Sequence, residues 1–193
     1  LVGGASSILD TNPQQAQALL EKAMDLDPKN AETHFYLGKI YTSAKDFPKA
    51  IQAYKKAIVL NPYYTDSYFN LGFLYFATKD YAKAEEMFGR VVELEPAYVD
   101  EAYFNLAVVQ NLQGKRKDSI RNLEKALEVN PDNKRAKKFL RRFKKTSRND
   151  KETYQSYYQS LSIALSGMEL YPDGLCKGGQ ICAAGEPETS FLG

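Results

Sequence analysis

The sequence contains no tryptophan, one histidine (His34) and two cysteines, Cys176 and Cys182, which both lie in the last twenty residues. This placement excludes a disulfide framework for the body of the chain and a four-cysteine zinc site. No apolar run approaches the ~20 residues that a membrane-spanning helix needs. The sequence shows no serine–histidine or cysteine–histidine arrangement, no phosphate-binding glycine loop and no metal-ligand spacing. It therefore predicts a non-enzymatic protein with no cofactor, no metal site and no small-molecule substrate.

The two cysteines enclose the segment Lys-Gly-Gly-Gln-Ile, whose glycines indicate a turn. A three-residue turn at 178–180 would place Cys176 opposite Cys182 on a small hairpin. A disulfide there requires an oxidising compartment, and two free thiols are the alternative. The opening nine residues are apolar but lack the charged start of a signal peptide, so the compartment stays unknown. The chain has no initiator methionine, and we expect it to be processed or trimmed.

Charge is unevenly distributed, although the net charge is only +2. Ten basic residues and one acid lie between Lys134 and Lys151. The other 16 basic and 23 acidic residues leave the remainder at −7. A mildly acidic body therefore carries a basic segment near its C-terminal end.

The dominant feature is a repeat, which occupies residues 31–62, then 65–96 and, more loosely, 100–131. Leu37 and Leu71 are 34 residues apart, and Leu71 and Leu106 are 35 apart. Eight positions recur in register: His34, Tyr68, Tyr103; Leu37, Leu71, Leu106; Gly38, Gly72, Ala107; Tyr41, Tyr75, Gln110; Ala50, Ala84, Ser119; Tyr54, Phe88, Leu123; Ala57, Val91, Ala126; and Pro62, Pro96, Pro131.

The spacing within each copy indicates two helices that pack closely. His34, Leu37 and Tyr41 share one helical face. Small residues such as Gly38 and Ala50 stand where two helices would cross, and each X-Pro step ends a helix. The pattern resembles the tetratricopeptide repeat, a 34-residue helix–turn–helix, over about residues 13–145. That resemblance implies an all-α fold, an α-solenoid of stacked helix pairs that binds other proteins.

We expect the chain to divide as follows: a partial first repeat over 1–30 with its second helix at 13–27; three full repeats at 31–64, 65–99 and 100–133; a basic capping helix at 134–148; an amphipathic helix at 149–171; and a flexible, Gly-rich tail at 172–193. Only Gly3-Gly4-Ala5 keep the register of a first helix in the first repeat, so we expect that repeat to begin broken. Either residues precede Leu1 or another surface covers this end.

The first helices of such repeats line the concave side of the array. Residues one step around these helices from the core positions are therefore predicted to form a partner-binding groove: Phe35, Lys39, Phe69, Asn70, Phe73, Phe76, Phe104, Asn105 and Val108. We expect Phe73 and Phe76 to face the groove, whereas Phe69 and Phe104 could instead pack between repeats. Only Lys39, Asn70 and Asn105 suit a carboxylate clamp. The aromatic lining favours an apolar helix or an extended aromatic peptide.

These features predict a scaffold, adaptor or assembly factor that holds a protein or peptide in the groove. The chain's own segment 154–168 is one candidate occupant. Self-association through the first repeat or the tail, giving a homo-oligomer, is one alternative. Another is that the basic cap, residues 134–145, binds nucleic acid or an anionic membrane, although a solvated cap explains the same residues. The identity of the partner does not follow from the sequence.

Overall fold

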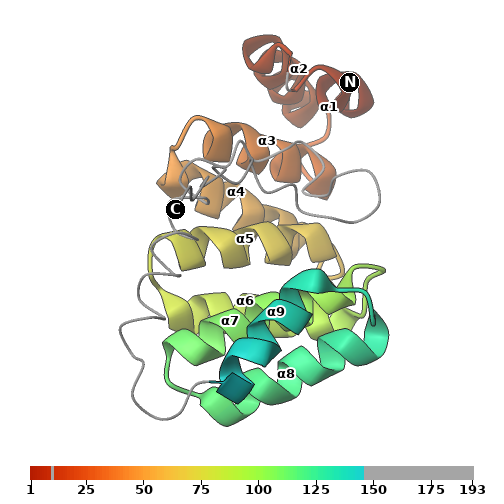
Figure 1. Ribbon diagram of the computed structural model, residues 1–193. Coiled ribbons are helices and arrows are strands. Elements are labelled where there is room, and N and C mark those ends of the chain that lie inside the picture. The colour runs from red at the N-terminus through yellow and green to blue at the C-terminus, as the bar shows by residue number, and fades with distance from the viewer. Residues whose placement is uncertain (10, 146–193) are drawn as a thin grey trace, which may run out of the picture.

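The computed structural model describes residues 1–9 and 11–145, and every regular element in this part of the chain is an α-helix. Successive helices pair antiparallel, and each pair stacks on the previous one (Figure 1). The predicted α-solenoid is confirmed. The helices are α1 (Val2–Ile8), α2 (Pro13–Leu26), α3 (Ala31–Ser43), α4 (Phe47–Leu60), α5 (Thr65–Ala77), α6 (Tyr81–Leu94), α7 (Val99–Leu112), α8 (Arg116–Val129) and α9 (Lys134–Lys145).

Local chemistry sets where the helices of each pair begin. The Asn30 side chain accepts a hydrogen bond from the Thr33 amide at 3.0 Å and so caps α3. Asp46 and Asp80 cap α4 and α6 in the same way. Such a cap stabilises a helix by about 1 kcal/mol, because it satisfies an amide that has no partner within the helix.

The turn between the two helices of a pair has a left-handed residue at the same place in each full repeat. These residues are Lys45 (φ 59°), Lys79 (φ 62°) and Gly114 (φ 79°). A side chain disfavours this backbone conformation, whereas glycine adopts it freely. The first two full repeats therefore carry a small strain that the third avoids.

Replacing Lys79 by Gly is accordingly expected to raise the free energy of unfolding by about 0.5–1 kcal/mol, since relief of the strain exceeds the entropy that glycine gains on unfolding. Lys79 is exposed, so little packing is lost. Urea denaturation measures the change. The reciprocal variant, Gly114→Lys, is expected to lower stability, and a destabilised Lys79→Gly protein would show that the turn is not strained.

The two helices of each full repeat cross closely because a small residue faces a large one. A Cβ atom added to Gly38 would lie 2.6 Å from the Tyr54 ring, and one added to Gly72 would lie 2.8 Å from the Phe88 ring. In the third repeat Ala107 occupies the same position, and the residue equivalent to Tyr54 is the smaller Leu123. The loss of the glycine thus coincides with the loss of the aromatic ring.

The first repeat differs from our expectation that it begins broken, because Val2–Ile8 forms a helix, α1. It has 7 residues, compared with 13 in α3. Ala5 is fully buried, and Leu9 after it is 4% exposed. With Ala16, Leu20, Leu37, Ile40 and Ala53 they form a small core distinct from the main one, which extends from Phe35 to Phe143.

At the other end, α9 covers the last repeat with one apolar stripe. Ala136, Phe139 and Phe143 are at most 4% exposed. The ring centroids of Phe139 and Phe104 lie 5.9 Å apart, which joins α9 to α7. The predicted helix at 149–171, the segment 154–168, the tail at 172–193 and the Cys176–Cys182 pair lie outside the described residues. No helix in the described part of the chain combines the length and apolar character needed to cross a membrane.

Candidate partner-binding groove

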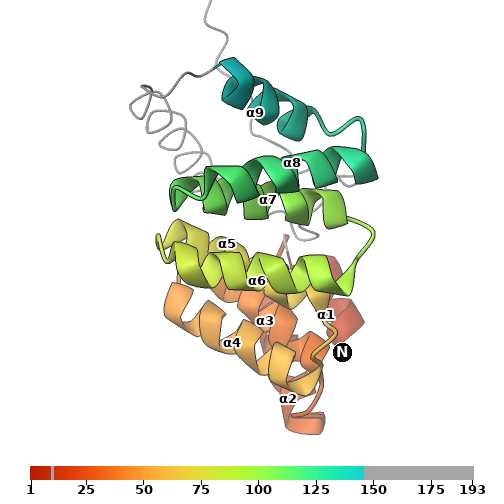
Figure 2. The same ribbon diagram turned by 90° about the horizontal axis from the view of Figure 1, so that it is seen from below.

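The stacked pairs form two layers, with α3, α5 and α7 in one and α4, α6 and α8 in the other (Figure 2). The predicted groove residues lie on α3, α5 and α7, which form the first of these layers. Helix α9 packs at the C-terminal end of the array (Figure 1).

A small cleft that opens to solvent lies between α5, α6, α7 and α9. The residues that line it are Phe73, Phe76, Phe88, Phe104, Asn105, Val108 and Arg135. Five of them belong to the predicted groove. Phe88 and Arg135 were not predicted, because Phe88 occupies a core position of its helix pair and Arg135 belongs to the cap.

Three of the predicted phenylalanines pack between repeats. Phe35 is 6% exposed, and its ring centroid lies 5.0 Å from that of Tyr64. Phe69 is 5% exposed, and its ring centroid lies 5.2 Å from that of Tyr98. Phe104 is 1% exposed and, as described above, contacts Phe139, while its edge also lines the cleft. These residues hold neighbouring repeats together.

The two phenylalanines that we expected to face the groove are more enclosed than a free surface residue would be. Phe73 is half-buried, and its ring packs against Phe69 at 4.9 Å and Phe88 at 5.3 Å. Phe76 is 9% exposed, and its ring centroid lies 6.0 Å from that of Tyr81. Both form walls of the cleft, because the helix pairs enclose the space above α5.

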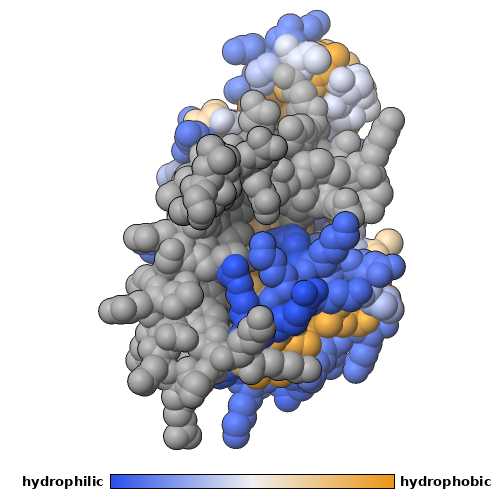
Figure 3. All heavy atoms as spheres, in the orientation of Figure 1, coloured by the Kyte–Doolittle hydropathy of each residue, from blue (hydrophilic) through white to orange (hydrophobic). Residues whose placement is uncertain are grey.

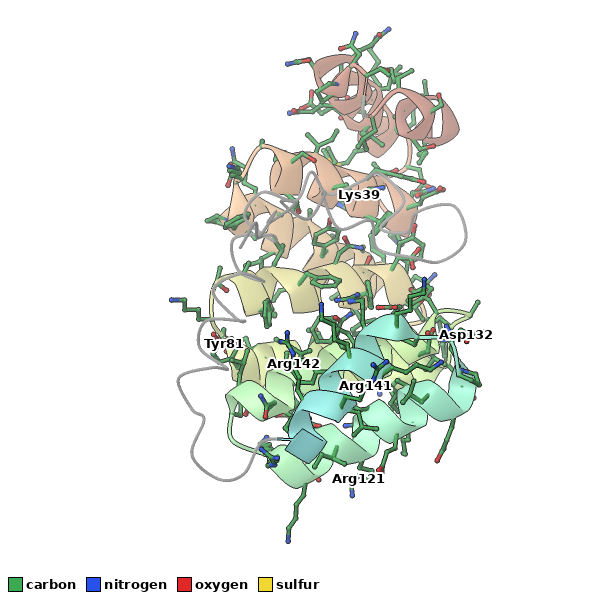
Figure 4. All side chains as sticks on the ribbon, in the orientation of Figure 1. Lys39, Tyr81, Arg121, Asp132, Arg141 and Arg142 are labelled. Carbon is green, nitrogen blue, oxygen red and sulfur yellow. The ribbon has the colours of Figure 1, made fainter. Side chains whose placement is uncertain are left out.

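The polar groove residues differ from one another. The Lys39 amine, labelled in Figure 4, lies 5.8 Å from the ring centroid of Phe35 and 5.6 Å from that of Tyr36. The Asn70 side chain donates to the backbone carbonyl of Asp66 at 2.8 Å, so this amide is occupied within its own helix. Asn70 is therefore a weaker candidate for gripping a peptide than the sequence indicates.

Asn105 carries the feature that points to a ligand. Its side chain is 5% exposed and lines the cleft, and its Nδ2 has no hydrogen-bond partner among the described residues. Leaving a buried donor unpaired costs about 1–3 kcal/mol. Three buried hydroxyls also lack a hydrogen-bond partner among the described residues, but they do not line the cleft: those of Thr33, Ser67 and Ser119. Asn105 is thus the cleft-lining residue whose buried amide donor no described residue uses.

Arg135 supplies a cation beside the cleft, but a buried acid partly neutralises it. Its guanidinium lies 4.2 Å from the Phe104 ring centroid and donates to Glu101 at 2.7 Å. Burial raises the pKa of Glu101, against the charge of Arg135 and a hydrogen bond from Asn133. Asn133 also donates to Asp100 and accepts from the Ala136 amide at the start of α9. This network fixes α9, and with it Arg135, against α7.

The fold and this groove define a helical-repeat scaffold. Family models described as TPR repeat match residues 38–79, and models described as tetratricopeptide repeat match residues 8–57 and 65–132. The chain belongs to the tetratricopeptide repeat family, whose fold generally serves protein interaction without catalysis. No curated protein matches the sequence.

Solved structures with the same fold include relatives of moderate identity. One is MamA, at 28% identity and a TM-score of 0.59, with 65% of this chain and 68% of that chain covered. Another is the first TPR domain of Spaghetti (RPAP3) bound to the HSP90 peptide SRMEEVD, at 27% identity and a TM-score of 0.55, covering 60% of this chain and 91% of that one. PilF of Pseudomonas aeruginosa has 23% identity and a TM-score of 0.61, with 68% of this chain and 60% of that chain covered. At this identity the match shows the fold alone.

Proposed function

We propose that the chain is an adaptor or assembly scaffold whose groove binds a segment of a partner protein, with the cleft beneath Asn105 as its anchor point. The observation that carries this proposal is the unpaired Nδ2 of Asn105 in a buried, phenylalanine-lined space. Phenylalanine walls suit an apolar side chain, and the single donor suits the carbonyl that accompanies such a side chain along a peptide.

The kind of partner is supported by the comparison with the RPAP3 domain, which was solved with a peptide bound. The charge pattern around the cleft favours an apolar segment over an acidic one. Arg135 is paired with Glu101, and Lys39 lies over two aromatic rings, so neither is presented as a free cation at the cleft. We therefore favour an amphipathic helix or an extended apolar peptide over a carboxylate-ended tail.

Replacing Phe73 by Ala is expected to abolish capture of the partner in affinity purification. Truncating an aromatic anchor at the centre of an interface costs about 2 kcal/mol or more, which is roughly a thirtyfold loss of affinity. Tyr63→Ala is the matched control, because Tyr63 is an aromatic residue that is 78% exposed and does not line the cleft. Circular dichroism establishes that each variant is folded.

The result that supports the proposal is a protein retained by the wild type and by Tyr63→Ala but lost with Phe73→Ala. Equal retention by all three would place the binding site elsewhere. Self-association through the first repeat or the tail, and occupation of the groove by the chain's own segment 154–168, stay predictions. Light scattering over a range of concentrations tests the first of them, and a strictly monomeric chain would contradict it.

A further inference from the structure

The second distinctive surface is the outer face of α9, which lies at the end of the array. Its exposed side chains include Lys134, Lys138, Arg141 and Arg142. Strongly hydrophilic residues gather over α9 in Figure 3, and Figure 4 shows Arg141 and Arg142 on this helix. Residues 115–145 contain 13 basic and 4 acidic residues, whereas residues 1–114 contain 10 basic and 14 acidic ones. The array therefore has a strongly cationic end on a mildly anionic body.

Some of these cations are used within the fold, and others are not. Arg135 pairs with Glu101, and Lys137 lies 3.5 Å from Asp132. Lys134, Lys138 and Arg141 have no acidic partner within 4.0 Å in the described part of the chain. They follow one another at i, i+4 and i+7, so they share a face and repel one another. A row of like charges that destabilises its own helix is explained if an anion binds along it.

The apolar residues of α9 narrow the choice of anion. Ala136, Phe139 and Phe143 are buried against the array, so the outer face offers charge without an exposed aromatic side chain. Protein interfaces have an apolar centre and are depleted in lysine. A helix that lies on a membrane inserts an apolar face, and a single-strand binder stacks bases on aromatic rings. Among the residues described, the outer face of α9 has no apolar centre, no apolar face that could insert into a membrane and no aromatic ring on which a base could stack.

We propose that the outer face of α9 binds the phosphate backbone of double-stranded nucleic acid without sequence preference. Backbone binding needs only Lys and Arg side chains, because phosphate contacts fix position without reading bases. Lys134 and Arg141 are seven residues apart, or about 10 Å along the helix axis. A duplex presents about six phosphate charges over this length, at one per ~1.7 Å. The row of cations thus meets a matching row of anions.

The test is a binding titration of the full chain with a fluorescently labelled duplex of about 20 base pairs. Lys134, Lys138 and Arg141 predict a slope of log affinity against log salt of about −3. Raising the salt from about 50 mM to about 200 mM should therefore weaken binding by about 40-fold.

The decisive variant combines Lys138→Glu with Arg141→Glu. The control, Lys55→Glu with Lys56→Glu, makes the same change in net charge at two exposed lysines of α4. We expect the α9 variant to bind the duplex at least about tenfold more weakly than the control, with a shallower salt slope. Because all four substituted side chains are exposed, both variants should stay folded. The α9 variant should unfold at the same temperature as the control or higher, since it removes repulsion within α9. Lys134→Glu with Lys138→Glu serves as a second test.

Equal binding by the α9 variant and the control would overturn the proposal. So would tighter binding of the wild type to vesicles containing about 30% phosphatidylserine, or to polyglutamate, than to the duplex. Arg135 and the cleft residues are unchanged in every variant, so failure here leaves the proposed groove untouched.

Discussion

Replacing Gly38 by Ala is expected to lower the free energy of unfolding by about 2–3 kcal/mol, because the added methyl group overpacks the crossing of α3 and α4. A Cβ atom at this position would lie 2.6, 2.7 and 2.9 Å from three carbons of the Tyr54 ring. Tyr54 is 1% exposed, and its ring lies 5.8 Å from that of Phe35, so the ring cannot move aside freely. The two helices must separate instead.

Tyr54→Leu should partly rescue Gly38→Ala, because the third repeat already pairs Ala107 with Leu123 at these positions. Tyr54→Leu alone is expected to cost about 2 kcal/mol through the cavity it leaves. The double variant should therefore be more stable than the sum of the single effects by at least about 1 kcal/mol. Besides the ring itself, which packs 5.8 Å from that of Phe35, the exchange removes one polar contact, from the Tyr54 hydroxyl to Thr42 at 3.4 Å.

Gly89→Ala is the control for the substitution itself. Gly89 lies within α6, and a Cβ atom there would meet nothing within 4 Å. Since alanine favours helix over glycine by about 1 kcal/mol, this variant should be slightly more stable than the wild type. Urea denaturation of the five proteins measures all these changes. A Gly38→Ala protein as stable as Gly89→Ala would show that the helices do not cross as closely as described.

Replacing Asn105 by Leu is the second change from which we expect a large effect, in this case on binding. The wild-type amide is a buried donor without a partner among the described residues, so removing it should not destabilise the fold. The free energy of unfolding should stay equal or rise by up to about 1 kcal/mol. Affinity for the bound segment should fall at least about tenfold, because a buried hydrogen bond to the ligand is lost. Opposite signs for stability and binding are typical of a residue kept for its ligand.

Much of the fold follows from the register of the repeat. Leucine, glycine and alanine at fixed spacing predict paired helices, and the structure shows why those positions repeat: Gly38 faces Tyr54, and Gly72 faces Phe88. The short helix α1 did not follow, because Gly3 and Gly4 carry no side chain from which a helical pattern could be recognised. Burial of Ala5 against α2 and α3 stabilises it instead.

The groove could be predicted only in part, because the register gives the face of a helix but not the angle between repeats. It identified Phe73, Phe76 and Asn105, yet it could not show that the Asn70 amide is taken by the carbonyl of Asp66 while that of Asn105 has no partner. Arg135 was missed as a cleft residue. The sequence does carry a signal for this contact, because Arg135 lies 34 residues after Glu101, which is one repeat length. In the structure Arg135 donates a hydrogen bond to Glu101.

The proposed function requires that the groove binds an apolar peptide segment through Asn105. The most direct measurement is the affinity of the wild type, Asn105→Leu and Asn70→Leu for one peptide, selected on the wild type from a displayed library, alongside their unfolding free energies. We expect Asn105→Leu to bind at least about tenfold more weakly at undiminished stability, and Asn70→Leu to bind within about threefold of the wild type. An Asn105→Leu protein that binds the peptide as tightly as the wild type would contradict it.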